Sequence, residues 1–152
     1  AGLKYKNRRE DGDFYGHRLG RLCGKEILRM HPEAIVPVSV HPARERKRGY
    51  NQAEILAKNV GKNLKVKIGD DVITRSKRTV NQKELSKRDR MVNLLKAFAY
   101  NKESKCNIKG KRILIIDDIY TTGATMDAAA LLLKKNGAKE VFFITVATGK
   151  GF

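Results

Sequence analysis

Apolar positions along the chain follow two spacings, and the change between them divides the sequence into alternating helices and strands. Helical spacing marks residues 13 to about 30, with Asp13 as the N-cap, and residues 53–60, where the second helix is predicted to end near Gly61. A continuous apolar run at 34–38 predicts a short buried strand between them. The apolar face of the first helix is expected to belong to the core and comprises Tyr15, Leu19, Leu22, Cys23 and Ile27.

The middle of the chain continues the alternation. Residues 71–74 predict a strand, and Ser86 with an acid three residues later predicts the start of a helix that runs through Leu95. Residues 112–117 then form an apolar run without alternation, as a parallel strand buried on both faces should.

The last third completes a unit of strand, helix and strand. A helix is predicted from about Thr125 to Asn136, stopped at Gly137, and a buried strand at 141–147 follows it. The leucines and alanines at 128–133 are expected to pack in the core. Because right-handed crossovers join neighbouring parallel strands, the order predicts a doubly wound α/β fold with a mainly parallel sheet flanked by helices.

Composition supports one folded domain over residues 1–152, since 41% of the residues are hydrophobic and 32% are charged. The net charge of +17 is unevenly distributed: from Ile113 onward four basic residues balance four acidic ones, so the whole excess lies before that point. It concentrates at 3–9, at 43–48 and between Arg75 and Arg90. Such runs attract polyanions, either nucleic acid or compact anions such as pyrophosphate, although any single run can also be a solvated surface.

Cysteine usage and hydropathy bear on the compartment. Cys23 and Cys106 lie far apart and show no metal-ligand spacing with the three histidines, so a reduced cytoplasmic protein is expected. No apolar run approaches the roughly 18 residues of a membrane span, and the basic start lacks an apolar stretch behind it, so membrane insertion and secretion are not expected. The chain begins at Ala1 rather than at methionine, which leaves open a preceding segment.

The stretch RILIIDDIYTTGAT, residues 112–125, carries the clearest chemistry. Asp117 and Asp118 close the predicted strand, at the end where open α/β sheets bind ligands. Residues 121–125 then supply a glycine-containing turn at the start of a helix, which suits a phosphate. Two carboxylates beside a phosphate cradle require a ligand that donates hydrogen bonds or carries metal, and a ribose 5-phosphate offers vicinal hydroxyls for the acids and a phosphate for the loop.

The segment ILIIDDIYTTGAT resembles the phosphoribosyl-pyrophosphate (PRPP) signature of type I phosphoribosyltransferases. Further motifs resemble the competence-associated ComF-type branch of that family: LKYKNRR near the start, PVSVHPARERKRGYNQAE at 37–54, Thr-x-x-Gln-x-x-Leu at 79–85, Arg-x-x-Asn at 90–93, and Ala-Phe at 97–98. The resemblance spans nearly the whole chain. It implies a Rossmann-like fold of the type I phosphoribosyltransferase class, and it implies a zinc-binding segment upstream in many members.

The resemblance also implies roles for individual positions, all centred on PRPP. The paired acids would hold the ribose 2- and 3-hydroxyls, directly or through Mg²⁺ and its waters, and the loop would wrap the 5-phosphate. A second set would lie near the pyrophosphate. No catalytic residue is assigned, and the implied residues are Asp117 and Asp118 for ribose and Mg²⁺, Thr121, Thr122, Gly123, Ala124 and Thr125 for the 5-phosphate, and Val38, Ser39, Arg44, Arg48, Arg88 and Arg90 for the pyrophosphate.

Two departures from the family pattern concern the acceptor. Members that act on 6-oxopurines carry an aspartate immediately before the Thr-Gly pair, where this chain has Thr121. Only a few residues, up to Phe152, follow the last predicted strand, so the acceptor-binding hood is expected to be minimal or absent. Two other classes fit worse: a P-loop NTPase needs GxxxxGK[ST], which does not occur, and a receiver domain places its acidic pair after the first strand.

Two functions from different classes therefore stay open. One is a Mg²⁺-dependent phosphoribosyltransferase of unknown acceptor, which transfers the pentosyl group from PRPP and releases pyrophosphate. The alternative is a non-catalytic, nucleic-acid-binding accessory factor in DNA uptake or recombination. The expected partners are PRPP, then single-stranded DNA or a DNA-uptake or replication-restart protein, and because this fold often pairs, a homodimer is one expected assembly.

Overall fold

The computed structural model describes residues 18, 21–38, 45–47, 49–75, 86–120 and 123–148, with the backbone alone at 119, 120, 147 and 148. A helical segment at 21–29 precedes the first strand. The elements that follow are β1 (Ala34–Pro37), α4 (Gln52–Leu64), β2 (Lys67–Ile68), β3 (Ile73–Arg75), α5 (Lys87–Ala97), β4 (Phe98–Tyr100), β5 (Arg112–Tyr120), α6 (Ala124–Lys135) and β6 (Glu140–Thr148).

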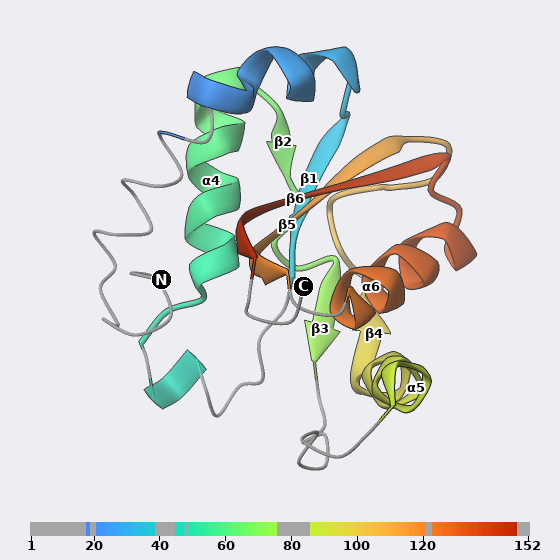
Figure 1. The fold of residues 1–152 in the computed structure, drawn as a ribbon. Coiled ribbons are helices and arrows are strands. Elements are labelled where there is room, and N and C mark those ends of the chain that lie inside the picture. Colours follow the sequence, from blue (N-terminus) through green and yellow to red (C-terminus); the bar gives the residue numbers. More distant parts are fainter. Residues whose placement is uncertain are drawn as a thin grey trace.

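The central sheet has four strands in the order β2-β1-β5-β6, and every pair is parallel. From β1 the chain moves outward to β2, whereas from β5 it moves outward to β6 on the other side. Because parallel crossovers are right-handed, this reversal places α4 and α6 on opposite faces, as Figure 1 shows. The predicted doubly wound, mainly parallel α/β fold is confirmed, with its switch point between β1 and β5.

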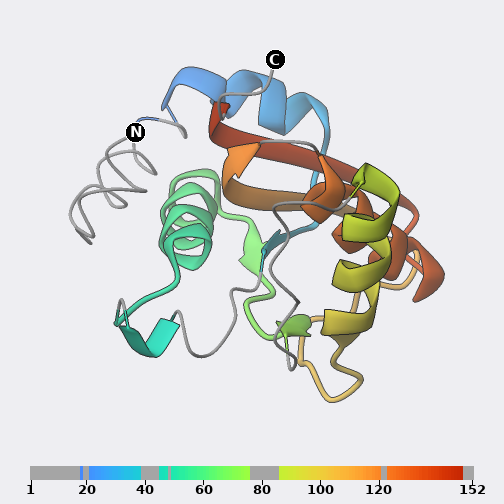
Figure 2. The same ribbon diagram turned by 60° about the horizontal axis from the view of Figure 1, so that its bottom comes forward.

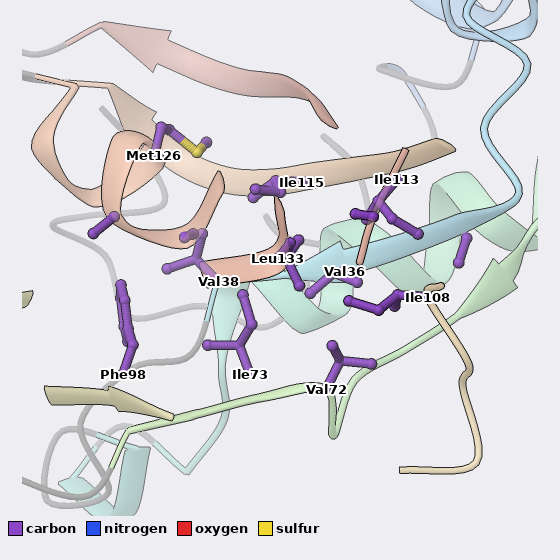
Figure 3. Close-up of a cluster of buried hydrophobic side chains, with 14 of the residues drawn as sticks. Val36, Val38, Val72, Ile73, Phe98, Ile108, Ile113, Ile115, Met126 and Leu133 are labelled. Atoms are coloured by element: carbon purple, nitrogen blue, oxygen red, sulfur yellow. The ribbon is translucent and has the colours of Figure 1, made fainter. Parts of the chain in front are cut away.

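Two hydrophobic clusters hold the layers together, one on each face of the sheet. On one face Ile27, Leu56 and Val60 from the helices meet Leu114 and Ile116 of β5. On the other, Figure 3 shows Ile113 and Ile115 of β5 among side chains from β1, β3, α6 and the segment before β5. Ile113 to Ile116 are all fully buried, which confirms the prediction of a strand apolar on both faces.

A second, antiparallel sheet of β3 and β4 lies outside the central one, and α5 precedes β4 directly. Helix α5 runs alongside α6 in Figure 2, and its Leu94 is buried in the same cluster as Leu133 of α6. Ser86 begins α5 as predicted, because its hydroxyl accepts the N–H of Asp89 at 3.1 Å. The sequence pattern did not predict β2 or β4, which have two and three residues and therefore too little length for a periodicity.

Three residues expected to be buried are exposed, and one of them is Phe143 of the edge strand β6, at 51%. Leu22 is 68% exposed, because the helix at 21–29 buries Ile27 and half-buries Cys23 on a different side. Leu131 is 46% exposed, because α6 turns Ala128, Ala129 and Leu133 toward the sheet. Tyr15 and Leu19 lie outside the described residues. The apolar spacing in the sequence therefore predicted a wider buried face than either helix has in the structure.

Helix α4 also extends beyond its predicted end at Gly61. It continues to Leu64 and closes with Lys65 in the left-handed conformation, at a φ of 55°. Gly61 is buried inside the helix because β2 passes close to it: a Cβ there would lie 2.8 Å from the carbonyl oxygen of Val66. This glycine serves close packing rather than termination. None of the described helices has the length and apolar character that crossing a membrane requires.

Candidate ribose-phosphate site

Asp117 and Asp118 lie near the carboxyl end of β5, immediately after its four fully buried residues. Asp117 stands in register with Thr145 of β6, and the carboxylate Oδ1 of Asp117 accepts the backbone N–H of Asp118 at 2.8 Å. Both acids are half-buried. The pair therefore occupies the sheet edge predicted for it, next to the switch point of the fold.

The surroundings disfavour a negative charge on Asp117. Burial raises the pKa of the Asp117 carboxyl well above its usual range, and the nearby carboxylate of Asp118 raises it further. The Arg75 guanidinium acts in the opposite direction, but the two raising effects prevail. A carboxylate pair held in this way favours ligands that donate hydrogen bonds or carry positive charge, which is what vicinal hydroxyls or a metal ion supply.

Arg75 connects the acidic pair to the basic region of the chain. It is the last residue of β3, half-buried, with its guanidinium carbon 5.5 Å from the centre of the Phe98 ring. Its guanidinium lowers the pKa of Asp117, so the first residue of the Arg75–Arg90 segment acts electrostatically on the acids. The sequence singled out that segment as a whole, whereas the structure distinguishes Arg75 within it.

The start of α6 supplies the predicted phosphate loop. Gly123 is the N-cap with a φ of 78°, which only glycine adopts readily, and its carbonyl accepts the N–H of Asp127 at 2.8 Å. Gly123 and Ala124 are buried and Thr125 is half-buried, so the helix begins directly after β5 with its positive end at the carboxyl edge of the sheet. Thr121 and Thr122 lie outside the described residues.

Val38 follows β1 and lies next to the acidic pair. Its N–H donates to the carbonyl of Ile116 at 2.9 Å, so the backbone extends the pairing of β1 with β5 up to the residue before Asp117. The structure thus brings one predicted pyrophosphate residue and the predicted ribose residues to the same edge. Ser39, Arg44 and Arg48 lie outside the described residues.

Arg88 and Arg90 lie in the first turn of α5. The side chain of Lys87, one residue earlier, forms an ion pair of 3.6 Å with Asp127 in the first turn of α6. That contact places the amino end of α5 beside the amino end of α6. Arg88 is exposed and Arg90 is half-buried.

One residue at this edge was missed by sequence reasoning. Asn51 is only 8% exposed and caps α4, because its Oδ1 accepts the N–H of Ala53 at 3.0 Å. Its Nδ2 donates to the carbonyl of Val38 at 3.2 Å. An asparagine just before a helical apolar pattern predicts an N-cap, so the sequence could have indicated this role of Asn51. The bond to Val38 joins positions 13 residues apart, and no local sequence pattern predicts it.

Neither cysteine shows a bonded partner. Cys23 and Cys106 are both free thiols, and burial raises the pKa of Cys106. Within the described ranges no three His, Cys, Asp or Glu side chains gather closely enough to hold a metal on their own. A cation at Asp117 and Asp118 would therefore need further oxygen ligands from a substrate or from water.

Comparison with known proteins identifies the class of protein. The model of the phosphoribosyl transferase domain family matches residues 46–151, which is well over half of the chain. The fold agrees, since purine phosphoribosyltransferase from Pyrococcus horikoshii superimposes with a TM-score of 0.57 at 18% identity, over 89% of this chain and 73% of that one. A hypoxanthine phosphoribosyltransferase from Staphylococcus aureus gives 0.54 at 16% identity, over 93% and 65%. The chain belongs to the phosphoribosyl transferase domain family.

Curated relatives narrow the branch. Competence protein F of Haemophilus influenzae is 36% identical over 82% of this chain and 56% of its own length. DNA utilization protein YhgH of Escherichia coli K12 is 32% identical over 91% and 61%, and competence protein ComFC of Streptococcus pneumoniae is 34% identical over 86% and 56%. The chain is thus a ComF-type member of the family, as its motifs predicted, and it spans little more than half the length of these relatives.

Proposed function

We propose that the chain binds PRPP at the carboxyl edge of β1 and β5 and transfers the ribose 5-phosphate to an acceptor with release of pyrophosphate. The observation that carries the proposal is the half-buried acidic pair near the end of β5, with the glycine-capped start of α6 a few residues later. Carboxylates accept hydrogen bonds from the ribose hydroxyls, while a helix amino terminus attracts the 5-phosphate.

The charges at the site match the charges that develop during transfer. The bond from C1 of the ribose to the pyrophosphate oxygen breaks, its electron pair leaves with the pyrophosphate, and a lone pair of the acceptor forms the new bond to C1. Positive charge grows on the sugar ring, near the acids, and negative charge grows on the leaving group, toward the arginines. Arg75, Arg88 and Arg90 are the described arginines of β3 and α5.

Mg²⁺ fits the donors that the site presents. It prefers hard oxygen ligands and is commonly held by one or two carboxylates together with substrate phosphates. Asp117 and Asp118 offer such carboxylates, and a bound cation would counteract the burial and the Asp118 charge that raise the pKa of Asp117. When bound, the ion would neutralise charge on the pyrophosphate as it leaves.

Calorimetry with PRPP and MgCl₂ tests binding, and pyrophosphate release tests transfer. The assay includes a panel of nucleobases and amines, because no described residue identifies the acceptor. Saturable binding with acceptor-dependent pyrophosphate release supports the full proposal. If PRPP binds but no acceptor causes release of pyrophosphate, the protein binds PRPP and the proposed transferase activity is wrong.

A second candidate function is binding of single-stranded nucleic acid, and a hollow of about 730 Å³ favours it. The hollow lies at the carboxyl end of α6, whereas the phosphate loop lies at the amino end, about 18 Å away along a helix of 12 residues. Lysines can contact phosphates, an aromatic ring can stack on a base, and none of the described residues that line the hollow is acidic. Its lining is Tyr100, Lys102, Ser104, Asn107, Lys109, Lys135, Asn136 and Gly137.

The net charge of +17 and the names of the relatives, which refer to competence and DNA utilization, agree with this second function. Fluorescence anisotropy with a labelled oligothymidine at increasing salt measures it. Replacing Lys102, Lys109 and Lys135 together by Gln should weaken binding and flatten its salt dependence. A control with the exposed residues Lys25, Lys62 and Lys65 replaced by Gln removes the same net charge elsewhere. Equal losses in both triple variants would show that charge alone matters and not the hollow.

A further inference from the structure

Strand β6 forms one edge of the central sheet and β2 forms the other, and the two edges differ in length and charge. β2 has two residues, one of which is Lys67, and short edge strands that carry lysine resist pairing with another chain. β6 has nine residues, Glu140–Thr148, without proline and with Glu140 as its one charged residue. Within the described residues β6 pairs with β5 alone. By the same rule, β6 is the edge suited to accept a further strand.

The side chains of β6 are apolar toward both faces of the sheet. Val141 packs against the cluster on the α6 face, whereas Phe142 and Ile144 pack against the cluster on the α4 face. All three are half-buried, although β5 beside them contains four fully buried residues in succession. Phe143 shares the face of Val141, because side chains alternate along a strand, and it is 51% exposed. A strand added beside β6 would therefore cover apolar surface on both faces.

The distribution of charge favours a second copy of this chain as the occupant. The net charge of +17 makes two copies repel each other wherever their basic surfaces meet. From Ile113 onward basic and acidic residues balance, and β6 lies within this neutral part. Two copies can therefore approach through β6 with little repulsion. A polyanionic partner would instead be attracted to the basic part of the chain, before Ile113.

We propose that two copies of the chain associate through β6, with the two strands antiparallel and the two four-stranded sheets joined into one. A twofold axis perpendicular to the sheet then relates the copies, so the association closes at a dimer. The two exposed Phe143 side chains lie on the same face of the joined sheet, and the two Glu140 carboxylates lie at opposite ends of the strand pair. The inference goes beyond the proposed function, because PRPP takes no part in it.

Sedimentation equilibrium tests the dimer. An interface centred on one strand is small, which predicts a dissociation constant in the micromolar range, so protein concentrations from about 5 to about 200 μM are used. Raising the salt from about 0.1 to about 1 M should tighten the dimer, because salt screens the repulsion between copies. Binding to a polyanion would weaken over the same range. A monomer at every concentration and salt, or association that weakens with salt, would overturn the inference.

The substitution Phe143→Lys tests the surface, and Val92→Lys is the matched control. The two native side chains are 51% and 40% exposed, and each variant adds one positive charge per copy. Val92 lies on α5 rather than on the central sheet. We expect the dimer to weaken at least about tenfold in F143K and less than about threefold in V92K. Equal weakening in both variants, or none in F143K, would show that the copies associate through another surface.

Hydrogen exchange provides a second readout, which depends on no variant. When the protein is concentrated from monomer to dimer, backbone amides of β6 should gain protection, while those of β2 at the other edge should not change. If the β6 amides are equally protected in the dilute monomer, another segment covers this edge and the inference is wrong. Urea midpoints show whether F143K and V92K keep the fold. Because no ligand enters these measurements, the proposed function is tested separately from them.

Discussion

The backbone N–H of Asp118 donates to the carboxylate of Asp117 at 2.8 Å, so the acidic pair is bonded to itself as well as to the end of β5. The same two residues repel each other when both are ionised, and this proximity adds to the effect of burial on the pKa of Asp117. The strand holds the two carboxylates close together although their negative charges repel each other. Carboxylates held in this way are typical of a ligand site and not of a stabilising contact.

Replacing Asp117 and Asp118 by Asn should abolish binding of PRPP with Mg²⁺. Asparagine keeps the shape and an accepting oxygen but removes the negative charge that a cation requires. Because the charges oppose each other in the fold, stability should be retained or increased. Calorimetry measures the loss of PRPP binding, and urea denaturation measures the stability. Unchanged PRPP affinity in the double variant would contradict the assignment of Asp117 and Asp118 to the PRPP site.

The raised pKa of Asp117 predicts a pH dependence of stability. Between the ordinary aspartate pKa, near 4, and the higher folded value, the native state binds more protons than the unfolded state, so this group makes stability fall as pH rises. Above the folded pKa the loss is complete. The variant Asp117→Asn should therefore match the parent protein below about pH 4 and exceed it at neutral pH. Urea midpoints across this range measure the difference, and a less stable variant at neutral pH would refute the prediction.

Arg75 should contribute to ligand affinity more than to folding. Its guanidinium lowers the pKa of Asp117 against the larger effect of burial, and its cation–π contact with Phe98 is worth only about 0.5–1 kcal/mol. Replacing Arg75 by Gln should raise the Asp117 pKa further and weaken PRPP binding. The exposed Lys96→Gln serves as a control of equal charge on α5. Equal PRPP affinities in the two variants would show that Arg75 does not contribute to PRPP binding.

Gly61 should resist substitution although it lies inside a helix. Alanine would place a Cβ 2.8 Å from the Val66 carbonyl oxygen, and nearer still to the Ile68 side chain. We expect a net loss of about 1–3 kcal/mol in the free energy of unfolding, despite a helix-propensity gain of up to about 1 kcal/mol. Urea denaturation measures it, with the exposed Lys62→Ala as a control expected to change stability by less than about 0.5 kcal/mol.

The sequence by itself determined the architecture and the chemistry of β5 and α6. The apolar run before Asp117 requires a strand covered on both faces, and the glycine at 123 requires a tight entry into the next helix, so both follow from local physical rules. The motif at 112–125 therefore placed the acids near the end of a strand and Gly123 at the start of a helix, as the structure has them. Ser86 likewise predicted the start of α5, because its hydroxyl caps that helix.

Only the tertiary structure decided which distant groups meet at this edge. The electrostatic effect of Arg75 on Asp117, the bond from Asn51 to Val38, and the passage of β2 over Gly61 each join residues whose separation carries no periodic signal. The exposure of Leu22 and Leu131 depended in the same way on how each helix was rotated against the sheet. Local patterns specify elements, but contacts between elements follow from packing, because burial is shared among segments that the sequence keeps apart.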